Sequence, residues 1–271
     1  MTFLFWNIRK NPLQDLLAVL VREHSVDVLI LAECEIDDVT LLETLNKNQS
    51  PKYGIALNYV PNKRIKIFTL LPRDSFQPLR DEGTAVFHLL HPPIGKEIIL
   101  VSVHLSSKMF QSDRDQAFNV TTLAQAIREV EIQVGHSRTL VVGDLNMNPF
   151  EDGLVAAATL HAVMTKEIAL RKSRIVSGEE KLFFYNPMWG QFGDYTPGVP
   201  GTYYYGSGNQ VNYFWNIFDQ VLLRPQLLTH FDEKNLQILS DVGKKSLLNK
   251  RGIPNTSFAS DHLPILFQLS I

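Results

Sequence analysis

The sequence contains little cysteine, no excess of positive charge and no long hydrophobic run. Only one of its 271 residues, Cys34, is a cysteine, so an intramolecular disulfide is impossible and thiol chemistry is a poor explanation of function. The 26 Lys and Arg residues are balanced by 28 Asp and Glu residues, and the net charge of −2 is not that of a general polyanion binder. No apolar run approaches the roughly 20 residues of a transmembrane helix. These absences predict a soluble protein of a reducing compartment, the cytoplasm.

The first forty residues have the pattern of a strand, a helix and a second strand. The apolar start predicts a strand ending at Asn7, because it lacks the basic region and cleavage site of a signal peptide. Apolar residues at i, i+3, i+4, i+7 and i+8 predict a helix over about 12–23, with Pro12 in its first turn. The next strand is expected over 26–31. A right-handed crossover of this length places both strands in one sheet with their carboxyl ends on the same side.

The same alternation continues to the C-terminus. Apolar runs predict strands over 98–105, 139–142, 218–223 and 263–269, and one apolar helix face is expected between 120 and 134. No linker rich in Pro, Gly or Ser divides the chain, and no internal repeat is visible. The sequence therefore predicts a mixed α/β protein with a large sheet core.

Residues 183–218 differ from the rest. They hold 13 of the 27 aromatic residues and 6 of the 15 glycines, without clear periodicity over much of their length. We expect a long ordered loop or an irregular excursion between core strands, since aromatic density argues against disorder and long ordered loops are usually functional.

Polar side chains end or adjoin several of the expected strands. Each alone has an ordinary explanation, such as a turn-forming Asp after Gly143 or a buried histidine at position 104. In open α/β sheets, however, ligands bind outside the carboxyl ends of strands. The residues concerned are Asn7, Glu33, His104, Asp144, Asn146, Asp219, Asp261 and His262.

Taken in order, the short motifs around these residues resemble the endonuclease/exonuclease/phosphatase superfamily, which has the deoxyribonuclease I-like fold. The motifs are Trp6-Asn7-Ile8, Leu31-Ala32-Glu33, Ser102-Val103-His104-Leu105, Gly143-Asp144-Leu145-Asn146, Phe218-Asp219-Gln220-Val221-Leu222 and Ser260-Asp261-His262. The resemblance spans nearly the whole chain and implies one domain over 1–271, built as a four-layer α/β sandwich of two packed mixed β-sheets flanked by helices. One departure is Ala32, where the family commonly has Gln, so a hydrogen bond supporting Glu33 is either missing or supplied from elsewhere.

The resemblance also implies a metal site for Mg²⁺ or Mn²⁺. Its expected ligands are Glu33 and Asp261, supported by Asn7. These are oxygen donors without a cysteine cluster, which suits a hard cation better than a structural zinc. The ion would neutralise phosphate charge.

By the same resemblance, Asp144 orients and deprotonates the attacking water, and the amide of Asn146 fixes that water or a phosphate oxygen. His262 is paired with Asp219, which favours the imidazolium opposite the transition-state charge. His104 is the second phosphate-facing histidine, and the sequence leaves open which histidine protonates the leaving oxygen. An aspartyl-phosphate mechanism on Asp144 is disfavoured, because Asn146 cannot donate a catalytic proton.

Two features bear on the substrate. Basic residues cluster before Asp261 and around residue 64, and on the rim of a site they would hold a polyanion; these are Lys244, Lys245, Lys250, Arg251, Lys63, Arg64 and Lys66. Aromatic side chains of the 183–218 segment would stack against bases or a sugar, and the candidates are Trp215 and the run Tyr203, Tyr204 and Tyr205. The alternatives are a solvated surface loop and an aromatic loop that packs on itself.

Three functions follow from these features. A metal-dependent nuclease or phosphodiesterase is the leading one, with nucleic acid as the expected substrate. Hydrolysis of a smaller phosphate ester, such as an inositol phosphate, a nucleotide or a phospholipid headgroup, is the alternative and agrees with the slightly acidic charge balance. A catalytically silent binding protein is disfavoured by the complete set of acids and histidines. The sequence gives no sign of an obligate protein partner.

Overall fold

The central strands are apolar on both faces because each face packs into a different core. In β1 (Thr2–Asn7), Phe3 and Phe5 belong to one hydrophobic cluster, and Leu4 and Trp6 belong to another. Alternate side chains of a strand point to opposite faces, so β1 separates two buried layers. The computed structural model describes residues 1–58, 62, 64–107, 113–194 and 198–271, without the side chains of residues 113 and 114.

The first sheet has six strands in the order β16-β19-β1-β2-β4-β3. β1 pairs in parallel with β2 and antiparallel with β19. The other strands of this sheet are β2 (Val28–Ala32), β3 (Gly54–Ile55), β4 (Ile65–Thr69), β16 (Gln237–Ile238) and β19 (Ile265–Gln268).

The second sheet has seven strands in the order β5-β6-β7-β8-β15-β12-β9. Its centre is the parallel pair β7 and β8, and β15 runs antiparallel beside β8. The strands are β5 (Phe76–Asp81), β6 (Ala85–Leu90), β7 (Ile98–His104), β8 (Thr139–Asp144), β9 (Ala162–Val163), β12 (Phe184–Tyr185) and β15 (Asp219–Leu223).

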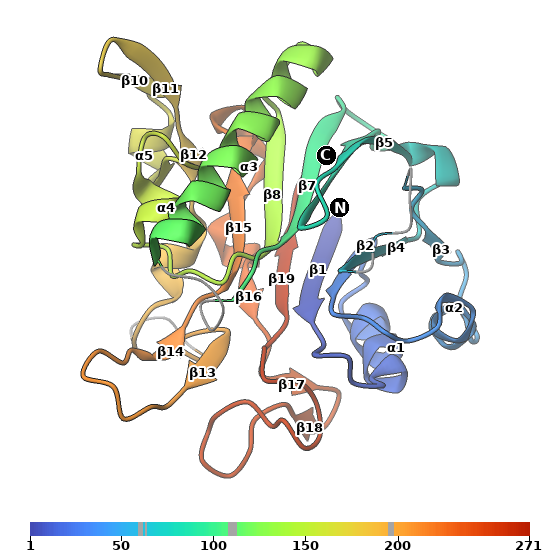
Figure 1. Cartoon of the computed structure of the whole chain (residues 1–271). Coiled ribbons are helices and arrows are strands. Elements are labelled where there is room, and N and C mark those ends of the chain that lie inside the picture. The colour runs from blue at the N-terminus through green and yellow to red at the C-terminus, as the bar shows by residue number, and fades with distance from the viewer. Residues whose placement is uncertain (59–61, 63, 108–112, 195–197) are drawn as a thin grey trace.

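Three hydrophobic clusters show how the layers are stacked. One lies between the sheets and takes residues from both, including Phe3 and Leu140. The second joins the first sheet to α1 (Gln14–Glu23) and α2 (Asp38–Leu45), and the third joins the second sheet to α3 (Asp113–Val134). Figure 1 shows α3 alongside β8 and β15, with α1 and α2 on the other side of the molecule. The four-layer arrangement of two mixed sheets flanked by helices is confirmed.

The remaining elements are short. They are α4 (Asp152–Val155), α5 (Lys166–Ala169), the hairpin β10 (Ser173–Val176) and β11 (Glu179–Leu182), the hairpin β13 (Tyr203–Tyr205) and β14 (Phe214–Asn216), the hairpin β17 (Asp241–Val242) and β18 (Lys245–Ser246), and 3₁₀ helices at Arg73–Ser75, Pro187–Gln191, Pro225–His230 and Glu233–Asn235. Among the described residues, no helix combines the length and the apolar character needed to cross a membrane.

Two expectations about local structure were wrong in detail. The first helix begins at Gln14 with Leu13 as its N-cap, so Pro12 precedes the helix instead of lying in its first turn. The segment 183–218 does run irregularly between core strands, but it also holds regular elements that were not expected, since it contributes β12 to the second sheet and folds its later part into the β13–β14 hairpin. These strands have only two or three residues each, too few for a two-residue hydrophobic alternation to be recognised.

Candidate active site

The predicted polar residues meet because of strand direction. Asn7 ends β1 and His104 ends β7, both in parallel pairs, and Asp144 ends β8. Asp219 begins the antiparallel β15 directly opposite Asp144. His262 lies just before the antiparallel β19, so it also reaches this end of the sheets.

Gly143, the residue before Asp144, is required by the packing of β8 against β7 and does not form a turn. A Cβ atom at this position would lie 1.9 Å from the carbonyl oxygen of Val103, and the φ angle of +149° is unfavourable for residues with side chains. This close approach sets Asp144 beside His104, its register partner on β7.

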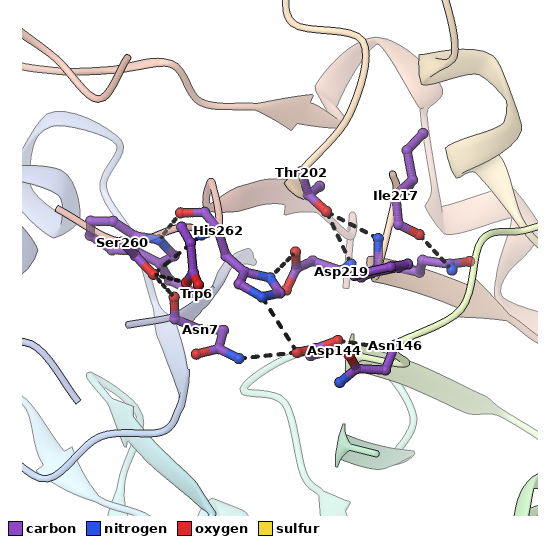
Figure 2. A network of polar contacts seen from close by, with 12 residues as sticks. Trp6, Asn7, Asp144, Asn146, Thr202, Ile217, Asp219, Ser260 and His262 are labelled. Atoms are coloured by element: carbon purple, nitrogen blue, oxygen red, sulfur yellow. Dashed lines mark hydrogen bonds and ion pairs between the residues drawn. The ribbon is translucent and has the colours of Figure 1, made fainter. Parts of the chain in front are cut away.

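His262 and Asp219 form a buried pair. The Nδ1 atom of His262 lies 2.8 Å from Oδ2 of Asp219, and its Nε2 atom lies 3.9 Å from Oδ2 of Asp144 (Figure 2). Thr202 accepts a hydrogen bond at Oγ1 from the backbone N–H of Asp219, and Trp6 donates from Nε1 to the carbonyl of His262. Asp219 therefore holds the imidazole ring of His262, and Trp6 holds its backbone.

The charge state of this pair follows from its surroundings. Burial by itself lowers the pKa of His262, but the charges of Asp219 and Asp144 outweigh burial and raise it to about 10. Burial raises the pKa of Asp144, against the lowering effect of His262. The geometry thus holds His262 as an imidazolium beside a carboxylate that takes up a proton more readily than an exposed aspartate does.

Glu33 is held in place by two side chains. His104 approaches its Oε1 atom through Nε2 at 3.4 Å, and Asn7 donates to the same oxygen from Nδ2 at 3.4 Å. The hydrogen bond with His104 is the main cause that lowers the pKa of Glu33 to about 2, although burial opposes it. Asn7 and His104 therefore supply the support that Ala32 cannot give, and Glu33 is ionised over the whole physiological range.

The hydrogen-bond network fixes which way the Asn7 amide points. Its Nδ2 atom donates to Glu33 and, at 3.0 Å, to Oδ2 of Asp144, while its Oδ1 atom accepts from the backbone N–H of Arg9. Both ends of the amide are thereby assigned. Asn7 therefore positions Glu33 and Asp144 by donating to both carboxylates. Its amide oxygen points away from them, toward the backbone of Arg9.

Asn146 adopts a left-handed backbone conformation with φ of 51°. Its backbone N–H donates to Oδ1 of Asp144 at 2.9 Å, and its side-chain amide donates to the carbonyl of Leu105 at 2.9 Å. Asn146 therefore orients Asp144 as well as lining the cleft.

These groups form the floor of a cleft of about 940 Å³. Its walls come from the β13–β14 hairpin, the loop between those strands, and the segments after β1 and β8. Tyr203 and Tyr205 of the predicted aromatic run line it, and the lining residues outside the predicted set are Arg9, Ser107, Asn148, Glu151, Ser207, Asn209, Val211, Asn212, Tyr213, Asn216 and Phe218. The cleft is much larger than a phosphate group alone requires.

The donor chemistry fits a hard divalent cation. Glu33 is an ionised carboxylate whose side chain is 31% exposed, and Mg²⁺ is commonly bound by one or two carboxylates with water and substrate phosphate completing its shell. Asp144, Asp219 and His262 also offer ligand atoms within 4.8 Å of one another. That second group is less suitable, because His262 is positively charged and its Nδ1 atom is already bonded to Asp219.

Comparison with known proteins agrees with this geometry. A model of the Endonuclease/Exonuclease/phosphatase family matches residues 4–262. The chain belongs to this family. No curated protein matches the sequence itself. The members of this family are hydrolases of phosphate esters. In this chain, the site at the ends of β1, β7 and β8 is the candidate active site.

Solved structures of family proteins have the same fold. A family protein from Leptotrichia buccalis C-1013-b is 15% identical with a TM-score of 0.58. A mannosyl-6-phosphatase from Bacteroides thetaiotaomicron VPI-5482 is 14% identical with a TM-score of 0.61, and an AP endonuclease from Archaeoglobus fulgidus is 13% identical with a TM-score of 0.56. In all three comparisons the alignment covers 100% of both chains. At this identity the likeness establishes the fold and not the substrate.

Most residues that the family resemblance points to meet in one cleft. Asp261 also lines it, but its Oδ2 atom pairs with Nε of Arg9 at 3.4 Å. Asp219 lies behind the cleft as the buried partner of His262. The structure thus brings these side chains together at one site, as the sequence predicted. The role of each residue remains a proposal.

Tyr204 and Trp215 are placed differently from the expectation. They are cross-strand partners in the hairpin, with ring centroids 5.5 Å apart, and neither lines the cleft. Trp215 packs instead against the hydrophobic cluster between the first sheet and α1. Because side chains alternate along a strand, the neighbours Tyr203 and Tyr205 face the cleft, and this alternation was the signal that could have distinguished them.

The basic clusters also lie outside the cleft lining. Lys244 and Lys245 are exposed at the β17–β18 hairpin, where Lys245 lies 5.4 Å from the ring centroid of Phe258. Lys66 is bound by Asp38 at 2.6 Å, and Lys63 lies outside the described residues. Arg9, whose guanidinium does line the cleft, had no motif signal in the sequence.

Proposed function

We propose that this protein hydrolyses a phosphate ester by attack of water on phosphorus, with the help of a divalent cation. The observation that carries the proposal is the arrangement of His262 and Asp144 at the floor of the cleft with Asp219 buried behind them, His262 lying 2.8 Å from Asp219 and 3.9 Å from Asp144. A buried, fixed imidazolium beside a carboxylate supplies both a positive charge for the transition state and an acceptor for a proton of water.

Each residue has a role in this proposal. Asp144, oriented by Asn7 and Asn146, takes the proton of the attacking water. His262, oriented by Asp219, donates a hydrogen bond to the phosphoryl oxygen on which charge accumulates. Glu33 would hold Mg²⁺ or Mn²⁺, which when bound neutralises phosphate charge.

His104 has the second imidazole at the floor. Its Nε2 atom lies 3.9 Å from Oδ2 of Asp144, the same separation as that of His262, and 3.4 Å from Glu33. It is therefore the second candidate, with His262, to protonate the leaving oxygen.

The walls of the cleft favour a compact substrate with an uncharged ring. The lining includes the carboxylates of Glu33, Asp144, Glu151 and Asp261, which would repel the additional phosphates of an extended polyanion. Beyond the floor it presents aromatic side chains, and rings of this kind stack on bases and sugars. We therefore favour an ester of about nucleotide or sugar phosphate size.

Nucleic acid is the second candidate. Figure 1 shows the β17–β18 hairpin, which carries Lys244 and Lys245, at the same end of the molecule as the β13–β14 hairpin. A strand that extends from the cleft across this end would meet these cations outside the acidic floor. The structural neighbours include both a mannosyl-6-phosphatase and an AP endonuclease, so either class is compatible with the fold.

The substrate proposal is tested with Tyr205→Ala and Tyr213→Ala. Base stacking contributes about 1–3 kcal/mol, so each variant should lose about 5- to 150-fold in kcat/KM on a nucleotide or sugar phosphate ester and much less on glycerol phosphate. Phe214→Ala is the matched control, because Phe214 is an exposed aromatic of the same hairpin outside the cleft lining. Efficient cleavage of long DNA or RNA, with small esters left intact, would instead support the second candidate.

A further inference from the structure

The loop after β1 is held in an unfavourable backbone conformation. Arg9 and Lys10 have φ angles of 50° and 60°, in the left-handed region that residues with side chains rarely adopt. Three hydrogen bonds maintain it, from the N–H of Arg9 to Oδ1 of Asn7, from the N–H of Lys10 to the carbonyl of Glu33, and from the N–H of Asn11 to the carbonyl of Ile8. Strain of this kind persists where the surroundings over-determine it, often at functional sites.

The strained loop directs the two cations to different places. Arg9 lines the cleft and contacts Asp261 through Nε at 3.4 Å, with its side chain 52% exposed. Lys10 does not line the cleft and pairs with Glu35 at 2.8 Å. A guanidinium has five N–H donors, and Arg9 approaches Asp261 most closely through Nε. The Nη groups of Arg9 form no hydrogen bond with the described residues and remain available to a ligand.

The contacts of Asp261 indicate that it positions the side chain of Arg9. Its Oδ2 atom faces Nε of Arg9, and its Oδ1 atom lies 3.3 Å from Oγ of Ser260, whose one hydroxyl hydrogen is nearer to the carbonyl oxygen of Asn7, at 2.7 Å. Asp261 is therefore held to the loop after β1 through Oδ2, and Ser260 beside it bonds the carbonyl of Asn7 in the same loop region. By contrast, the contacts of Glu33 are to His104 and Asn7 at the floor.

We propose that Arg9 binds the phosphoryl oxygens of the substrate through its Nη groups, and that Asp261 positions Arg9 and is not a metal ligand. The proposal rests on the proposed function and adds a substrate-binding residue to it. Guanidinium groups form paired hydrogen bonds with phosphate oxygens, and an exposed Arg9 at the cleft wall has the geometry to do so. The site would then combine one bound metal ion at Glu33 with a guanidinium supplied by the chain.

The test for Arg9 measures binding of inorganic phosphate to metal-free protein by ³¹P NMR titration. Asn tolerates the left-handed region better than most residues, so Arg9→Asn removes the charge without adding strain. Lys10→Asn is the matched control, with the same substitution at the adjacent strained position. We expect Arg9→Asn to weaken phosphate binding about 10- to 100-fold, as for loss of a charged hydrogen bond. Lys10→Asn should change it less than about threefold, since that lysine is at the surface.

The test for Asp261 measures Mn²⁺ affinity by electron paramagnetic resonance. Asp261→Asn should weaken phosphate binding while leaving Mn²⁺ affinity almost unchanged, whereas Glu33→Gln should weaken Mn²⁺ binding at least about tenfold. Equal loss of Mn²⁺ affinity in the two variants would overturn the role given to Asp261. Equal effects of the Arg9 and Lys10 variants, or no phosphate binding by the wild type, would overturn the role given to Arg9.

These measurements involve no turnover. A protein that binds phosphate through Arg9 but hydrolyses no ester would contradict the proposed function and leave the binding role intact. A protein that hydrolyses esters normally after Arg9→Asn, with unchanged phosphate binding, would contradict the binding role and leave the proposed function intact.

Discussion

Replacing Asp219 with Asn should change the charge state of His262 more than the fold. The carboxylate of Asp219 is fully buried and lies 2.8 Å from Nδ1 of His262. Asn has nearly the same shape and its Oδ1 atom can still accept a hydrogen bond from Nδ1–H. The substitution therefore removes one negative charge beside the imidazolium and keeps the ring in place.

The size of the effect follows from the hydrogen bond that loses its charge. Hydrogen bonds to charged groups contribute about 1.5–3 kcal/mol, and one pH unit in a pKa corresponds to 1.36 kcal/mol. The pKa of His262, about 10 in the wild type, should thus fall by about one to two pH units in Asp219→Asn. Because the ring stays mainly protonated at pH 7, the rate should fall less than the roughly 10²- to 10³-fold expected for His262→Ala.

Two measurements test this reasoning. The first is an NMR titration of the His262 ring in metal-free protein, compared between the wild type and Asp219→Asn. The second is the pH dependence of unfolding. A histidine whose pKa is raised on folding stabilises fully below its unfolded value of about 6.5, and this stabilisation is lost as the pH rises toward 10. The wild type should therefore lose more free energy of unfolding between pH 7 and 10 than Asp219→Asn does. An unmoved His262 titration in the variant would refute the assignment of the charge to this pair.

Three further predictions concern the metal, the packing of the site and the core. Glu33→Ala should nearly abolish ester hydrolysis and Mn²⁺ binding while keeping the thermal midpoint within a few degrees; wild-type turnover in this variant or in excess chelator would exclude the metal mechanism. Gly143→Ala should destabilise the protein by more than about 3 kcal/mol in urea unfolding, since its Cβ would lie 1.9 Å from a carbonyl oxygen of β7. The control Gly54→Ala should be nearly neutral, because the space around Gly54 is open. Arg224→Met should cost about 3–5 kcal/mol because it leaves the buried carboxylate of Glu131 without its partner at 2.9 Å, and adding Glu131→Leu should recover much of that loss; a double variant less stable than the single would contradict this.

The order of polar residues along the chain was enough to predict which of them form the floor of the site. Asn7, His104 and Asp144 each close an apolar strand, and the direction of parallel strands brings such ends together. The strands themselves were recognisable because both of their faces are buried, which makes them continuous apolar runs.

The walls of the cleft could not be predicted in the same way. Trp215 and the run Tyr203 to Tyr205 were selected for their aromatic character, but the pairing of β13 with β14 turns only Tyr203 and Tyr205 toward the cleft, and Trp215 packs toward the core. In a hairpin with strands of three residues, the side that faces the site is set by register and by contacts with distant segments. Local sequence carries little information about either.

The sequence by itself determined the α/β class, the central strands and the acids and histidines at their ends, because these depend on hydrophobic periodicity and on which residue types terminate each strand. Only the tertiary structure decided what each of those groups contacts. It oriented the amide of Asn7 toward two carboxylates, brought Arg9 to Asp261 across 252 positions of sequence, and left Lys244 and Lys245 outside the cleft. These contacts depend on the distances between segments that are far apart in the sequence. Those distances are set only when the two sheets pack together.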